Sequence, residues 1–132
     1  MDAGYGCNTD LRTSISALGL TYVAGILPNT TVWTSDTAPL PPKMWSGKGR
    51  PPKLLRRDHK HQPISVKELA VCLPKGVWRT IEWREDAAER LSSRFARARV
   101  CVAHRDFQLT GSRPDEWHLI EWPEGENEPT KY

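Results

Sequence analysis

The chain has 132 residues, a length typical of one domain, and only 38% of them are hydrophobic. No apolar run approaches the roughly 18 residues that a membrane-spanning helix needs, so the sequence predicts no membrane association. The chain has three cysteines, an odd number, and none of them forms a CxxC pair: Cys7, Cys72 and Cys101. They argue against a disulfide framework and favour a reduced, cytoplasmic protein.

The net charge of +3 is unevenly spread. Between Lys43 and His61 there are seven Lys or Arg and one acid, which gives +6 and leaves −3 for the remainder of the chain. A basic block of this kind indicates a polyanion as partner, and a solvated linker is the alternative interpretation.

The first 28 residues predict a helix followed by a strand. Asn8 or Thr9 can cap the helix, and Gly19 is suited to follow its last residue. The apolar residues of this helix fall on one face at helical spacing: Leu11, Ile15 and Leu18. Residues 21–27 (TYVAGIL) are nearly all apolar and predict a strand buried on both faces.

Residues 29–63 are rich in proline and show little periodicity. They predict an extended, basic linker with a short strand at Thr31–Trp33. A stretch this long without regular structure is unusual inside a compact domain, so it is either functional or a linker.

Residues 64–132 begin a new pattern. Ser65 and Glu68 have capping-box spacing, which predicts a short helix over Val66–Leu73 that Pro74 stops.

Three alternating segments after this helix predict a small antiparallel sheet with one polar face: Val77–Arg84, Ser93–Arg105 and Glu116–Trp122. In the second segment the small apolar residues share one face: Ala96, Ala98, Val100 and Val102. Arg97 and Arg99 lie on the other face, where they either line a DNA path or form a solvated surface.

Four blocks carry a resemblance to a known family. They are the stretch Met1-Asp2-Ala3-Gly4-Tyr5-Gly6, then Thr31–Lys53, Gln62–Leu73 and Glu116–Tyr132. In this order they resemble the DDE-type transposases of bacterial insertion sequences, the DDE superfamily endonucleases, and most closely their seven-zero-one branch. The first block is similar to the second-aspartate motif of that family.

The resemblance implies an α+β chain in three parts. Residues 1–28 would be a remnant of a ribonuclease-H-like core, residues 29–63 the Pro-rich basic linker, and residues 64–132 an inserted α+β module. The implied function is Mg²⁺-dependent DNA cleavage and strand transfer in transposition.

The chemistry of the family implies one catalytic residue here. Two Asp and one Glu hold two Mg²⁺ ions, which prefer oxygen ligands and stabilise the entering and leaving oxygens of a phosphodiester. Only Asp2 matches one of the three carboxylates, as a catalytic residue and metal ligand. Its alternative interpretation is a disordered terminal acid.

Because the first Asp and the Glu have no counterpart, we expect a truncated internal fragment, begun at an internal start codon at Met1. Such a fragment is expected to bind no Mg²⁺ and to be inactive alone.

The segment Gly47–Lys53 (GKGRPPK) resembles the core of an AT-hook, with Lys48 in place of the usual first Arg. An extended cationic segment of this kind fits a narrow A/T minor groove. Five residues are therefore predicted to bind double-stranded DNA: Lys48, Arg50, Lys53, Arg56 and Arg57. An ordinary solvated loop is the alternative.

Other reactive side chains give weaker patterns. His59, His61 and Cys72 match no zinc module, so exposed loop histidines are expected. Cys101 lacks a recognisable His/Asp arrangement and is not expected to be a nucleophile.

Two further functions stay open beside the transposase fragment. One is a non-catalytic DNA-binding fragment that interferes with a full-length transposase, located in the cytoplasm and at the nucleoid when DNA is bound. The other is a non-functional pseudogene product.

Overall fold

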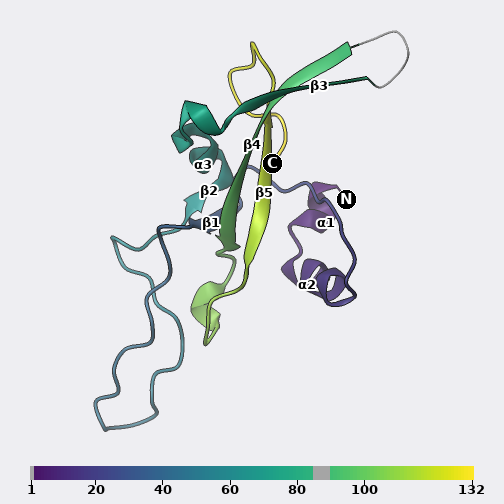
Figure 1. The fold of residues 1–132 in the computed structure, drawn as a ribbon. Coiled ribbons are helices and arrows are strands. Elements are labelled where there is room, and N and C mark those ends of the chain that lie inside the picture. The colour runs from purple at the N-terminus through teal and green to yellow at the C-terminus, as the bar shows by residue number, and fades with distance from the viewer. Residues whose placement is uncertain (1, 85–89) are drawn as a thin grey trace.

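The computed structural model describes residues 2–84 and 90–132 and shows a mixed α+β fold built on an antiparallel sheet (Figure 1). The helices are α1 (Ala3–Gly6), α2 (Thr9–Ala17) and α3 (Val66–Cys72), with single 3₁₀ turns at Lys75–Val77 and Asp106–Gln108. The strands are β1 (Thr31–Thr34), β2 (Ile64–Ser65), β3 (Arg79–Arg84), β4 (Arg90–Val102) and β5 (Asp115–Trp122). Met1, the first residue of the family-like motif, lies outside the described residues.

Strand β4 is the centre of the sheet, because β1, β3 and β5 all pair with it. Phe95 pairs with both Arg79 of β3 and Glu121 of β5, so these two strands lie on opposite edges of β4. Val100 pairs with both Thr34 of β1 and Glu116 of β5. It follows that β5 runs along one edge of β4, while β3 and β1 succeed each other along the other edge.

The antiparallel sheet expected from the alternating segments is confirmed. The strands begin and end within about three residues of the expected positions, the scatter common for element boundaries. On β4, Ala96, Val100 and Val102 are buried, whereas Arg97 and Arg99 are exposed. The period of two therefore separates a core face from a polar face, as predicted.

Helix α3 covers the core face at the β1 end of the sheet. Its Val66 and Leu69 form a buried cluster with Val32 of β1 and Val100 of β4. The expected capping box is present, since the backbone N–H of Glu68 donates to the Ser65 hydroxyl and the Ser65 N–H donates to the Glu68 carboxylate. The capping box thus starts α3 at Val66, which is also the first residue of the helix that packs in the core.

The N-terminal segment follows its prediction only in part. Asn8 caps α2 through its side-chain oxygen, and Gly19 follows the helix with a φ of 69°, as expected. Of the predicted apolar face, Leu11 and Ile15 are half-buried and Leu18 is 73% exposed, while the buried residue of the helix is Arg12. Arg12 is drawn inward because the Glu116 carboxylate and the Gly6 carbonyl both accept from its guanidinium.

The strand predicted at residues 21–27 is wrong. This segment is extended but forms no ladder and is half-buried or exposed. The Ile26 N–H donates instead to the carbonyl of Tyr132 (3.1 Å). Apolar and β-branched residues supply strand propensity, but a strand also needs a paired neighbour, and no described strand pairs with this segment.

The short strand expected at Thr31–Trp33 is confirmed as β1, which pairs with β2 and β4. Residues 35–63 then leave the sheet as a long loop, which we call the basic arm (Figure 1). The division of the chain into three domains stays a prediction. None of the described helices has the length and apolarity to cross a membrane.

Candidate nucleic-acid interface

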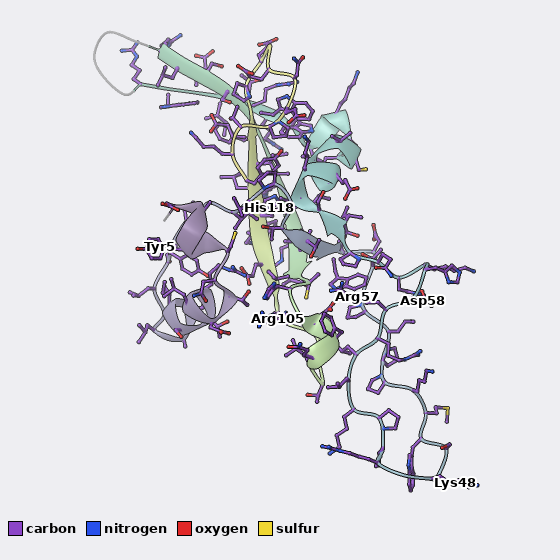
Figure 2. The ribbon with its side chains drawn as sticks, turned by 180° about the vertical axis from the view of Figure 1, so that it is seen from behind. Tyr5, Lys48, Arg57, Asp58, Arg105 and His118 are labelled. Atoms are coloured by element: carbon purple, nitrogen blue, oxygen red, sulfur yellow. The ribbon has the colours of Figure 1, made fainter. Side chains whose placement is uncertain are left out.

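The tip of the basic arm is a turn closed by local contacts. Gly47 and Gly49 have φ angles of 83° and 73°, in the left-handed region that favours glycine. The Trp45 indole N–H donates to the Gly49 carbonyl (3.2 Å) across the turn. Lys48 therefore sits at the point of the arm farthest from the sheet, with its side chain directed outward (Figure 2).

The cationic side chains of the tip are open to solvent. Lys43, Lys48, Arg50 and Lys53 are all exposed, and no salt bridge within the described part of the chain engages them. Their charges remain available to an external anion.

The base of the arm is pinned by backbone pairing. Leu40 and Arg56 exchange both N–H···O bonds (2.8 and 2.9 Å), so the outgoing and returning chains meet there. The Arg56 guanidinium donates to the Pro41 carbonyl (2.9 Å) and Leu55 is buried. The arm is thus anchored at one end and free at the other.

Arg57 anchors the arm to the sheet. Its guanidinium donates to the Asp106 carboxylate (3.0 and 2.6 Å) and to the Ala103 carbonyl (2.7 Å). The other Asp106 oxygen accepts from the Trp33 indole N–H (2.6 Å). Of the five predicted DNA-binding residues, Lys48, Arg50 and Lys53 gather on the exposed tip, while Arg56 and Arg57 turn to protein acceptors. A DNA contact by any of them stays a prediction.

Asp2 precedes α1, a helix that lies away from the tip of the basic arm (Figure 1). It caps α1, whose Gly4 N–H donates to its carboxylate (2.6 Å). Figure 2 shows Tyr5 of the same helix well separated from Lys48. Asp2 as a metal ligand and catalytic residue stays a prediction, and its carboxylate is exposed.

The described residues do not by themselves fit a two-metal centre. Among them, no three His, Cys, Asp or Glu side chains gather closely enough to hold a metal ion. Asp58 accepts hydrogen bonds from the backbone of Lys60 and His61, and its carboxylate meets the His61 ring (2.8 Å). The hydrogen bond with His61 is the main reason that the pKa of Asp58 falls to about 2.

Two buried polar residues of this region were not expected from sequence. Arg12 of α2 bonds Glu116 of β5 (3.2 Å) and ties the N-terminal helices to the sheet. His118 lies on the core face of β5, where burial lowers its pKa to about 4, and its Nε2 has no hydrogen-bond partner in the described structure. The alternation along β5 could have placed His118 on the core face. No comparable pattern in the sequence indicated that Arg12 is buried.

Cys101 is half-buried, and burial is the main cause that raises the pKa of its thiol. A raised thiol pKa reduces the thiolate fraction, so the geometry does not favour a nucleophile.

Comparison with known proteins returned no match among curated proteins and none among solved structures. A family did match: residues 1–90 fit the family described as DDE superfamily endonuclease. The matched span holds α1 to β3 and the whole basic arm, and it covers about two thirds of the 132 residues. This family is associated with transposase-type cleavage of DNA and typically uses a divalent metal. The chain belongs to the DDE superfamily endonucleases.

Proposed function

We propose that this chain acts in DNA transposition and that its basic arm binds double-stranded DNA, at transposon ends or in the target. The observation that carries the proposal is the exposed cationic tip in a member of a DNA-cleaving family, where Lys48, Arg50 and Lys53 form no ion pair with any residue that the structure describes. The seven-zero-one branch, the ribonuclease-H-like remnant at residues 1–28 and a cytoplasmic location at the nucleoid belong to the same proposal.

The shape of the tip supports minor-groove binding. Pro51 and Pro52 keep the chain extended after Arg50, and the two left-handed glycines flank Lys48 without bulk. A narrow A/T minor groove has an enhanced negative potential that attracts Arg and Lys side chains. The anchored base holds this segment out from the sheet, where a duplex has room to approach (Figure 1).

Catalysis is proposed only for an assembly in which Asp2 is joined by the two other acids of the family. A two-metal centre needs ligands fixed by several elements, and here the Asp2 carboxylate serves as a helix cap. By itself the chain is proposed to be inactive, which leaves a non-catalytic DNA-binding fragment as the second function. Such a fragment would compete with a full-length transposase for DNA.

The first experiment measures binding of an A/T-rich duplex by fluorescence anisotropy at two salt concentrations. The triple variant K48A/R50A/K53A is expected to bind at least about tenfold more weakly. Its salt slope should fall by about 0.9 for each phosphate that the variant no longer neutralises. The matched control is K75A/R79A/R84A, which removes the same charge from exposed positions outside the arm.

Equal weakening by both triple variants would show that only net charge matters and would overturn the arm as the DNA site. Mg²⁺-dependent nicking of supercoiled plasmid by the purified chain, abolished in Asp2→Ala, would overturn the proposal that it is inactive alone.

A further inference from the structure

The polar face of β4 and β5 carries an aromatic side chain between two cations. Arg99 pairs directly with Trp117 across the two strands, and Arg97 pairs with Leu119. Both guanidinium carbons lie 5.0 Å from the Trp117 ring centroid. We call Arg97, Arg99 and Trp117 the Arg-Trp-Arg cluster.

The indole of this cluster is open to solvent. Trp117 is 61% exposed even with two guanidinium groups at its ring, and its neighbour Leu119 is 52% exposed. An exposed cation–π contact contributes only about 0.5–1 kcal/mol, so folding stability alone gives little reason to display a tryptophan here. By contrast, Trp33 is fully buried.

The two arginines keep their charges free. Arg99 donates to the Asp115 carbonyl (3.1 Å), which leaves its positive charge uncompensated. Within the described residues, neither Arg97 nor Arg99 forms a salt bridge. The face therefore offers one flat aromatic surface and two unneutralised cations within a few ångströms of each other.

A strand of nucleic acid with an unpaired base has the complementary chemistry. An unstacked base presents a flat ring for the indole, and its flanking phosphates present negative charge to the guanidinium groups. A base inside a duplex presents only its edge, so this cluster selects single-stranded segments. A protein partner would satisfy the ring but not both charges unless it supplied acids.

We propose that the Arg-Trp-Arg cluster binds single-stranded nucleic acid, with one unpaired base stacked on Trp117 and the adjacent phosphates held by Arg97 and Arg99. This site is distinct from the basic arm, which leaves the sheet from β1, and it lies outside the residues matched to the family. It does not depend on the proposed function, because a free oligonucleotide is sufficient to test it.

The experiment titrates the full chain with a labelled oligothymidylate and with an abasic strand of the same length. The wild type is expected to prefer the strand with bases, and Trp117→Leu to bind it about tenfold more weakly, since stacking on an aromatic side chain is removed. Trp117→Phe should restore part of the affinity. Arg97→Gln with Arg99→Gln should weaken both strands and flatten the salt dependence.

Trp83→Leu is the matched control, because Trp83 is also exposed but lies on β3, outside both the basic arm and the Arg-Trp-Arg cluster. It should leave the preference for bases over the abasic strand unchanged. Repeating the titration in the K48A/R50A/K53A background removes the electrostatic contribution of the arm, and the effect of Trp117→Leu should persist. Thermal melts check that each variant folds.

Equal affinity of the wild type for the two strands would overturn the proposal. So would a concentration-dependent dimer in sedimentation that Trp117→Leu abolishes, because the exposed indole would then belong to a contact between two copies of the chain.

Discussion

At the scale of single residues, Asp106 holds the base of the basic arm against the sheet through its ion pair with Arg57. It is buried, and its carboxylate accepts from Trp33 of β1 and from Arg57 of the arm. Removing one partner of a buried ion pair leaves the other charge uncompensated, which costs more than the pair itself contributes.

Asp106→Ala is therefore expected to lower the free energy of unfolding by about 3–5 kcal/mol, because it orphans both the Arg57 guanidinium and the Trp33 indole N–H. Urea denaturation followed by tryptophan fluorescence measures the change. Asp115→Ala, at an exposed carboxylate, is the control and should stay within about 0.5 kcal/mol of the wild type. An Asp106→Ala variant as stable as the control would contradict the anchoring role of this carboxylate.

The role of Arg57 illustrates what single residues do not reveal from sequence. Its position in a run of cations indicated a polyanion partner, but its acceptor Asp106 lies 49 positions later in the chain. A charge count records that a cation is present and not which acid it meets. Lys48 and Arg50 have no long-range partner in the described structure, so the charge count of the tip correctly indicated exposed cations there.

At the scale of elements, prediction succeeded where the signal was local. The capping box of α3 involves residues three apart, and the alternation of β4 and β5 reports the two faces of the sheet directly. It failed at residues 21–27, where an apolar run predicted a strand but no described strand pairs with the segment. Pairing is non-local, and propensity alone does not supply it.

Ser65→Ala tests the local signal. Loss of the hydroxyl leaves the Glu68 N–H without its acceptor at the start of α3, and we expect a loss of about 1 kcal/mol in stability. Because α3 contributes Val66 and Leu69 to the core, the loss should appear in the global transition of a thermal melt. Ser46→Ala, in the exposed part of the arm, should leave the melting temperature unchanged.

At the scale of the whole molecule, the pH dependence of stability should carry the signature of His118. Its pKa is about 4 in the fold against 6.5 in the unfolded chain, so between these values the unfolded chain binds more protons. Stability should be level above about pH 6.5 and fall by about 3 kcal/mol as the pH drops toward 4.

Denaturant melts between pH 7 and 4 measure this loss, which His118→Leu should largely remove. Two charged groups lie close to this face, Arg12 and Glu116, and they pair with each other. Asp58 affects stability at lower pH, because its pKa falls from 3.8 to about 2 on folding and its contribution is lost only as the pH drops between these values. Parallel profiles for the wild type and His118→Leu would show that the pKa of His118 is the same in the folded and unfolded chains.

The catalytic arrangement of the family was beyond sequence reasoning on this chain. One aspartate in a matching motif predicts a metal ligand, but a metal centre is an arrangement of several acids in space. The described fold gives Asp2 a backbone N–H as its partner, on a helix away from the arm. The cationic run of the arm was more accessible, because charge is readable within one segment, and its contact with DNA stays a prediction.

The central position of β4 has a consequence for how this protein is made. Strands β1 and β3 leave the ribosome before residues 90–102, which form β4. The backbone N–H and C=O groups of β1 and β3 that pair with β4 therefore have no partner until that later stretch emerges. Until then the nascent chain exposes unpaired strand edges and its apolar side chains. Pairing of β1 and β3 must therefore wait for β4, and the interval before β4 emerges is when chaperones or self-association would capture the chain.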